Sequence, residues 1–490
     1  MSILAVSCVT NALLQVCNKN VTPSYYYQNM HKNRPGILAV LISIYTTLLF
    51  GSICGCDGTK KIANQDASKA ADASRKPDAA RDAQTEASTG PVRCIERWPE
   101  DPKASPKPSL KDVGDPRVLW KKKLPSDIYS PETVLAGEHL GVVGGDTLWI
   151  LDRTTGEESG NLPVSGTYRG YAALVADKEE TFYYGTSSIR AVKPDGSVRW
   201  EKALGDNLAS DIEETITSKL QLSPEGVLYF SATDGYLYAL RSKDGSTVWK
   251  KKVGLDSDGY ALSVGWGVGD TLRSDVAYQA DTGETNAPIT IDGFSGSSFG
   301  IIGSYSGLIA FRYDSFGDEY PWRGYFLDKC GKLLWSFPNT SSTSWFPELV
   351  GYNDELLVDG DRRNDSAYVY SRSGERLQGP RPIRGAPTSL GADNTIYNIE
   401  CSGDLSQEAT ASLAIVAYSW AIKELWSLDL GKVCTSSGTA LADDGVLYVT
   451  RQLSDGIEVI AVQTASPGLA PTAYPTRDNN NRRTRWLGPL

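Results

Sequence analysis

Residues 227–249, with the sequence VLYFSATDGYLYALRSKDGSTVW, decide the fold of this chain. Apolar and aromatic residues alternate with small or polar ones, and this period of two is typical of half-buried β-strands. The Asp-Gly pairs at 234–235 and 244–245 supply the positive φ angles that tight hairpin turns need. The stretch therefore predicts three antiparallel strands joined by two tight turns, with Trp249 at its end.

The same pattern recurs along the chain. Tryptophans close its segments at Trp120, Trp200, Trp249, Trp335 and Trp426. Once the longer gaps are halved, their spacing is about 43 residues, the length of one four-stranded propeller blade. The octapeptide LSPEGVLY at 222–229 also returns as LADDGVLY at 441–448.

These repeats predict an all-β fold, an eight-bladed β-propeller of four-stranded antiparallel blades over residues 113–472. Each blade has two apolar faces that neighbours must cover, and the closing tryptophans are expected to fill the wedges between blades. Residues 254–298 lack a closing Trp, although VAYQADTG at 276–283 is a degenerate copy of the repeat. If they form an insertion, the blade count is seven. Residues 118–124 are expected to pair with the last blade and close the ring.

The segment YALRSKDGSTVW at 238–249 resembles the PQQ-like propeller repeat, and WILDRTTG at 149–156 is similar to the start of that repeat. The resemblance extends from about residue 120 to residue 470. It implies the propeller fold but leaves the function open. The superfamily includes quinoprotein dehydrogenases and non-enzymatic, BamB-like outer-membrane assembly lipoproteins.

The N-terminus resembles a bacterial lipoprotein signal. Residues 1–29 show no pattern and are expected not to be translated. Residues 30–56 contain a basic region, an apolar run and small residues that end in a lipobox-like ICGC. We expect lipid attachment at Cys56, with Cys54 as the alternative. The apolar run is short for a transmembrane helix, which is the competing interpretation.

Residues 57–112 are rich in Ala, Asp, Lys, Ser and Pro, so they cannot bury enough apolar surface to fold and are expected to form a disordered tether. Residues 473–490 resemble the tails found at the ends of PQQ-like propellers. These features predict a membrane-anchored lipoprotein of the bacterial cell envelope, facing the periplasm or the cell surface.

Four cysteines follow the lipobox: Cys94, Cys330, Cys401 and Cys434. An exported compartment permits disulfides. We expect Cys401 to pair with Cys434, because they lie in the seventh blade and at the start of the eighth. Cys94 would then join the tether to Cys330. Four cysteines allow three pairings, and the sequence does not choose among them.

Composition disfavours several classes of function. The net charge is −10, and no basic stripe with interleaved aromatics is present, so a nucleic-acid partner is not expected. The chain has two histidines, His31 and His139, which disfavours a histidine base or a histidine-rich metal site. The dehydrogenase resemblance would imply adjacent cysteines and a calcium site, but no two cysteines are adjacent and no calcium set aligns. We therefore expect neither PQQ nor calcium, and we assign no catalytic, cofactor-binding or metal residue.

Some local motifs have bland explanations. GSSFG at 296–300 has the spacing of a hydrolase elbow but is expected to be a blade turn, since no helix follows. DGDRRND at 359–365 has oxygen ligands, but its two arginines oppose a cation, so a solvated hairpin loop is favoured. GWGVG at 265–269 is expected to be a turn. Four aromatics outside the closing positions either bind a partner or glycan at the rim or pack between blades: Trp322, Trp345, Phe346 and Trp420.

The sequence thus predicts a non-catalytic binding or scaffold module for protein partners in the envelope. Two alternatives remain open. One is a propeller enzyme, either a PQQ-dependent or other oxidoreductase or a carboxylate-based hydrolase. The other is a carbohydrate or cell-wall binder.

Overall fold

A computed structural model describes residues between 103 and 487, all within the compact unit Glu86–Leu490; the other unit, Met1–Thr85, lies outside the description. Within this span the segments outside the description are 112–113, 126–130, 145–146, 164–172, 205–215, 217–219, 254–266, 269–270, 274–276, 286–298, 304–306, 314–321, 331, 339–348, 362–365, 384–386, 403–410, 433–435 and 472–485. The predicted signal, Cys56 and tether residues 57–102 therefore lie outside the described residues.

The described residues form eight four-stranded sheets, numbered here as blades in chain order. Blade 1 contains β2 (Glu132–Ala136), β3 (His139–Gly144), β4 (Thr147–Asp152) and β5 (Glu158–Pro163). Blade 2 contains β6 (Ala173–Ala176), β7 (Phe182–Gly185), β8 (Ser188–Val192) and β9 (Val198–Ala203). Blade 3 contains β10 (Gln221–Leu222), β11 (Val227–Ser231), β12 (Tyr236–Arg241) and β13 (Thr247–Lys252). Blade 4 contains β14 (Gly267–Val268), β15 (Thr271–Arg273), β16 (Ala277–Gln279) and β32 (Trp486–Leu487).

The second half of the ring continues this order. Blade 5 contains β17 (Phe299–Gly303), β18 (Leu308–Tyr313), β19 (Trp322–Leu327) and β20 (Leu333–Pro338). Blade 6 contains β21 (Leu349–Val350), β22 (Leu356–Asp361), β23 (Ser366–Tyr370) and β24 (Arg376–Pro382), with the 3-10 helix η1 (Tyr352–Asp354) after β21. Blade 7 contains β25 (Pro387–Leu390), β26 (Thr395–Ser402), β27 (Ser412–Ser419) and β28 (Glu424–Lys432). Blade 8 contains β29 (Ser436–Leu441), β30 (Val446–Leu453), β31 (Gly456–Gln463) and β1 (Arg117–Leu124).

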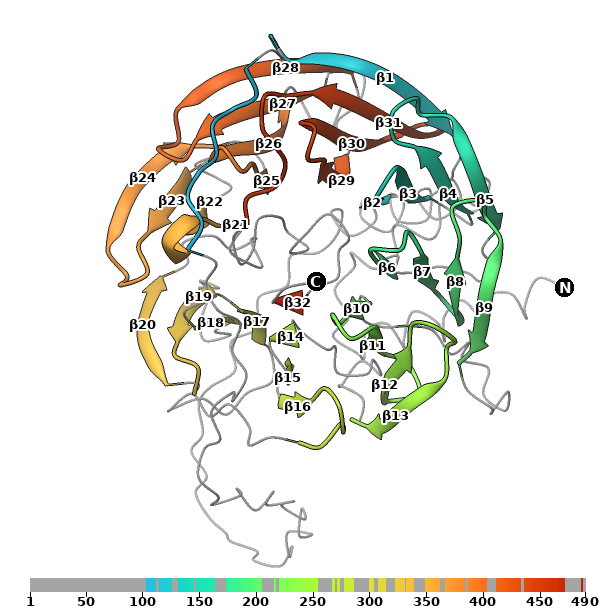
Figure 1. Ribbon diagram of the computed structural model, residues 1–490. Coiled ribbons are helices and arrows are strands. Elements are labelled where there is room, and N and C mark those ends of the chain that lie inside the picture. The colour runs from blue at the N-terminus through green and yellow to red at the C-terminus, as the bar shows by residue number, and fades with distance from the viewer. Residues whose placement is uncertain are drawn as a thin grey trace, which may run out of the picture. The chain divides into compact units, whose positions relative to one another are not determined.

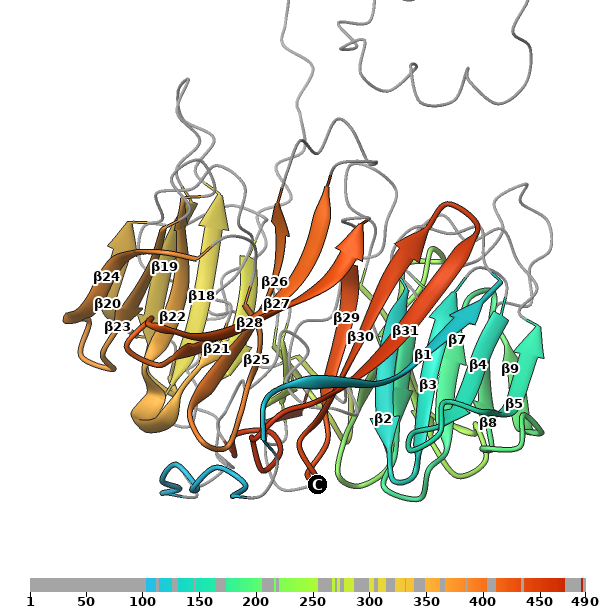
Figure 2. The same cartoon turned by 90° about the horizontal axis from the view of Figure 1, so that it is seen from above.

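The sheets are arranged radially around one axis, with β2, β6, β10, β21, β25 and β29 nearest the centre (Figure 1). These first strands contact their counterparts in the neighbouring blades, for example β2 with both β6 and β29. The sheets stand side by side when viewed along the ring plane (Figure 2). The predicted eight-bladed propeller is therefore confirmed.

The ring is closed by strand β1, which pairs antiparallel with β31 as the outer strand of blade 8. Arg117 lies opposite Gln463 and Leu124 opposite Ile457. The predicted closure by residues 118–124 is confirmed. Because the partners are more than 300 residues apart, this pairing fixes the two ends of the propeller to each other.

Blade 4 answers the open question about residues 254–298. Strands β14, β15 and β16 lie in or beside this region and form a sheet, so it is a blade and the seven-bladed alternative is wrong. The expectation of a turn at 265–269 is also wrong, because Gly267–Val268 is strand β14. Strand β32 pairs with β14 in parallel, so this one sheet is not wholly antiparallel as predicted. The tail 473–490 thus supplies a strand to the propeller.

The core lies between the blades, because each sheet has two apolar faces. Phe182 and Tyr184 of blade 2 are at most 1% exposed and belong to one cluster with Val134 and Ile150 of blade 1. Similar clusters join blades 2 and 3, blades 7 and 8, and blades 8 and 1. In the part of the chain that the structure describes, no helix has the length and apolarity to span a membrane.

Residues 103–111, which the sequence assigns to the tether, contact the propeller. The N–H of Lys107 donates to the carbonyl of Ala392 at 2.7 Å, and the N–H of Leu110 donates to Ala465 at 2.7 Å. These bonds attach the segment to blades 7 and 8. Ordered structure therefore begins before residue 113, the expected start of the propeller.

Candidate interaction surface

The closing tryptophans lie on outer strands, where four of them bind the next blade. Each of the four indoles donates to a carbonyl in the turn between the third and fourth strands of that blade: Trp120 to Arg153 (3.2 Å), Trp200 to Ser242 (2.8 Å), Trp249 to Ala280 (2.9 Å) and Trp335 to Arg372 (2.8 Å). The turn must approach the indole closely. At Gly245, where φ is +69°, an added Cβ would lie 2.7 Å from the Trp200 ring.

Trp426 is the exception, and the ring closure explains why. Its ring lies 5.9 Å from that of Tyr397, in the same manner as the other pairs. In the next blade the fourth strand is β1, which comes from the N-terminus, so no turn joins the third strand to the fourth. Trp426 therefore has no such turn to bind.

The propeller has two faces that differ in their connections. We call the turn face the side with the connections between first and second strands and between third and fourth strands, such as 223–226 and 242–246 in blade 3. We call the loop face the opposite side, with the connections between second and third strands, such as 232–235, and those between blades. Because each strand runs from one face to the other, these positions follow from the topology.

Long connections are confined to the loop face. Between named strands, connections on the turn face contain two to five residues. Six connections on the loop face have eight residues or more: 164–172, 204–220, 253–266, 314–321, 339–348 and 403–411. Connections of this length on a rigid scaffold are where binding residues concentrate.

The short turns use their own carboxylates. Asp152 Oδ1 accepts the N–H groups of Thr154 at 2.9 Å and Thr155 at 2.8 Å, and the Thr155 N–H is the main reason that the pKa of Asp152 lies below its usual value. Asp244 accepts the N–H of Ser246 at 2.9 Å in the same way. These carboxylates hold turns together and do not converge on a ligand site.

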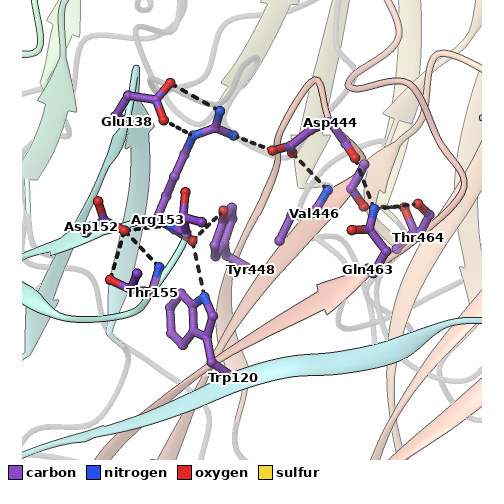
Figure 3. Close-up of polar contacts among 12 residues, drawn as sticks. Trp120, Glu138, Asp152, Arg153, Thr155, Asp444, Val446, Tyr448, Gln463 and Thr464 are labelled. Carbon is purple, nitrogen blue, oxygen red and sulfur yellow. Dashed lines mark hydrogen bonds and ion pairs between the residues drawn. The ribbon is translucent and has the colours of Figure 1, made fainter. Parts of the chain in front are cut away.

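One polar cluster on the turn face joins blades 8 and 1 (Figure 3). Arg153 Nη1 lies 3.0 Å from Asp444 Oδ2, and its Nη2 lies 3.3 Å from Glu138 Oε1. The carbonyl of Arg153 accepts the Trp120 indole and, at 2.9 Å, the hydroxyl of Tyr448. Burial raises the pKa of Tyr448, so it stays a neutral donor. The cluster holds the closed ring together.

A second set of contacts extends this cluster to blade 2. The N–H of Glu138 donates to Glu180 Oε1 at 3.1 Å, and His139 Nδ1 lies 2.7 Å from Glu180 Oε2. His139 is the only histidine after residue 31. Its partner is an interblade carboxylate, and it lies four blades away from Phe299–Gly303, where the hydrolase-like motif enters strand β17. This geometry does not support a serine hydrolase.

A shallow depression lies on the turn face of blade 6, lined by Asn353, Glu355, Ser371, Arg372 and Ser373. The indole of Trp420 in blade 7 donates to Glu355 Oε2. Burial raises the pKa of Glu355, and the Trp420 bond only partly opposes this. Trp420 thus packs between blades rather than at the rim.

The remaining predicted residues are placed as follows. Cys330 and Cys401 are both disulfide-bonded. Cys434 lies outside the described residues, so its pairing with Cys401 stays a prediction. Trp322 lies in β19, Asp359 and Asp361 in β22, while Trp345 and Phe346 lie outside the described residues. Among the residues that can be described, no three His, Cys, Asp or Glu side chains are grouped so as to hold a metal.

Sequence reasoning missed Arg153, Tyr448 and Arg451. Arg451 is 8% exposed and joins blades 7 and 8, with Nη1 2.9 Å from the carbonyl of Leu430 and Nη2 2.6 Å from Glu458 Oε2. The motif at 149–156 contains Arg153, but its partner Asp444 lies 291 residues away. A local pattern carries no signal for such contacts.

Comparisons with known proteins agree with this architecture. Residues 112–256 match the family model described as outer membrane protein assembly factor BamB. No curated protein matches the chain.

Solved structures with a similar fold include the crystal structure of BamB from Moraxella catarrhalis, which is 14% identical, covers 71% of this chain and 100% of its own, and has a TM-score of 0.48. The computationally designed Ika8 protein is 12% identical, with coverages of 69% and 98% and a TM-score of 0.48. The Dos1 propeller is 12% identical, with coverages of 72% and 97% and a TM-score of 0.48. Identities and TM-scores this low carry no argument about activity.

Proposed function

We propose that this chain, whose residues 112–256 carry PQQ-like propeller repeats of the BamB type, is a non-catalytic binding module for a protein partner in the bacterial envelope. The proposal includes lipid attachment at Cys56, which would anchor the module to a membrane. By analogy with the matched family, the partner is a component of outer-membrane protein assembly. The binding surface is the loop face.

The observation that carries the proposal is the unequal distribution of connections. On the turn face, two to five residues join each pair of named strands. All six connections of eight residues or more belong to the loop face. A scaffold that needed only stability would have short turns on both faces, since short connections cost less closure entropy.

The contacts on the turn face support the same conclusion. The Arg153 guanidinium binds Asp444 and Glu138, and the Glu180 carboxylate binds His139. Asp152 and Asp244 bind backbone N–H groups of their own turns. These polar groups are already engaged with the propeller itself, so the turn face offers fewer groups for a ligand.

Two exposed positions test the proposal in the full-length protein in its native envelope. A photo-cross-linking amino acid at Ser454, in the loop-face turn between β30 and β31, should give a covalent adduct with one partner protein. The same amino acid at Lys243, in the turn-face turn between β12 and β13, is the matched control and should give none. An adduct through Lys243 alone would refute the assignment of the binding face.

The proposal also requires that neither PQQ nor calcium is a resident cofactor. A ligand that binds the native state raises its melting temperature. Titration of the purified protein with PQQ and CaCl2 should leave the Tm unchanged. A saturable rise would instead support a quinoprotein enzyme.

A further inference from the structure

Cys330 and Cys401 are both in disulfides, and the fold keeps them apart. Cys330 lies in the connection 328–332 on the turn face of blade 5, whereas Cys401 lies near the loop-face end of β26 in blade 7. The strand from Thr395 to Cys401 spans about 20 Å at roughly 3.3 Å per residue. The Cα atoms of a disulfide lie within about 7 Å of each other. Each cysteine therefore has a different partner.

Cys434 is placed beside Cys401 by the strand register. Leu413 of β27 lies opposite Cys401 on one side and Gly431 on the other. Cys434 follows Gly431 closely, in the connection 433–435 at the loop face. Cys434 is thus the natural partner of Cys401, which leaves Cys330 to a cysteine that precedes residue 103.

The chain before β1 runs across the turn face towards Cys330. Leu110 is bound to Ala465 of blade 8, and Lys107 to Ala392 of blade 7. Ala104 packs against the cluster shared by blades 6 and 7. In Figure 1 the blue trace before β1 runs from beside β22 towards β28, and Figure 2 shows it on the same side of the ring as η1. Followed backwards, the chain therefore heads for blade 5.

Cys94 is within reach of Cys330 along this path. Nine residues separate position 94 from position 103, and an extended chain of that length spans up to about 30 Å. Neighbouring sheets are roughly 10 Å apart, so the turns of blade 5 lie one or two such steps from Ala104. An extended chain of this length covers the distance with residues to spare.

We propose that Cys94 is bonded to Cys330 and that residues 94–111 form a strap across the turn face from blade 5 to blade 8. Two thiols are oxidised to one disulfide, and two electrons and two protons pass to an exported protein disulfide, which becomes a dithiol. The strap covers the depression lined by Glu355 and Arg372. This deepens the proposed function, because a covered turn face leaves the loop face to the partner.

Mass spectrometry of the full-length protein tests the strap. The protein is alkylated with N-ethylmaleimide without reduction and digested with trypsin. The expected product is peptide 94–97 (CIER) linked to peptide 330–332 (CGK), alongside peptide 385–423 linked to 433–451. Cys330 linked to any other peptide, or recovered as its maleimide adduct, would overturn the proposal.

Limited proteolysis tests the position of the strap, as distinct from the bond. Cys94→Ser should accelerate native-state tryptic cleavage after the exposed Arg372, because the strap no longer covers the turn. Cys434→Ser is the matched control on the opposite face and should leave that cleavage unchanged. An unchanged rate in Cys94→Ser would show that the strap does not cross blade 6. A Ser454 adduct that persists without the linked peptide would sink the strap and leave the proposed function standing.

Discussion

The carbonyl of Ala280 allows a quantitative test of how one blade holds the next. It accepts the indole of Trp249 at 2.9 Å and the hydroxyl of Tyr229 at 3.0 Å, and Ala280 is 7% exposed. Trp249→Phe or Tyr229→Phe removes one donor and leaves the other. Each single change should cost about 0.5–1.5 kcal/mol for the lost hydrogen bond, besides any packing loss.

The double variant is expected to be worse than the sum of the single ones. It leaves a buried carbonyl without either donor, and an unsatisfied buried group costs about 1–3 kcal/mol. We therefore expect a coupling free energy of about 1–2 kcal/mol in a double-mutant cycle, in which the packing losses cancel. For about 380 ordered residues the unfolding entropy is roughly 0.8 kcal/mol/K, so each kcal/mol lowers the Tm by only about 1 °C. Calorimetry with replicate scans resolves such differences.

The matched control is the cycle of Trp426→Phe with Tyr397→Phe. Its rings are also 5.9 Å apart, as are those of Trp249 and Tyr229, but the two side chains share no carbonyl among the described residues. Its coupling should be limited to the ring contact. Equal coupling in the two cycles, or additive effects at Ala280, would show that the shared carbonyl does not join the blades.

Three further predictions concern the closure, the depression on blade 6 and the C-terminal strand. Leu124→Ala should cost about 2–5 kcal/mol in calorimetry, because the side chain is 1% exposed, whereas Leu119→Ala in the same strand, 41% exposed, should change the unfolding free energy by less than about 0.5 kcal/mol. Burial raises the pKa of Glu355, so the native state holds a proton that the unfolded chain releases, and stability falls as the pH rises above the ordinary carboxyl range; Glu355→Gln should raise the Tm near pH 7 and leave it unchanged near pH 3, and an equal shift at both would contradict this. Deletion of residues 473–490 removes β32, so hydrogen exchange should speed up in Gly267–Val268, and unchanged protection there would argue against the parallel pairing.

Much of the architecture was predictable, because a blade is a local unit. Turn residues, alternating apolar positions and the closing Trp all lie within about 43 residues of one another, so periodicity alone reports them. Blade 4 was ambiguous for the same reason: its repeat lacks the Trp, and its sheet takes a strand from Trp486–Leu487. The candidate interaction surface could not be predicted as such. Loop lengths are visible in the sequence, but the face on which each loop lies depends on strand order.

The sequence by itself determined the blade, its repetition and its closure by residues 118–124, since each depends on pattern and on the need to cover apolar sheet faces. Only the tertiary structure decided which distant groups meet. It brought Arg153 to Asp444 across 291 positions, and it placed Cys330 and Cys401 on opposite faces. The physical reason is that periodicity is a property of neighbouring residues, whereas these contacts arise when the ring closes and its two ends become adjacent.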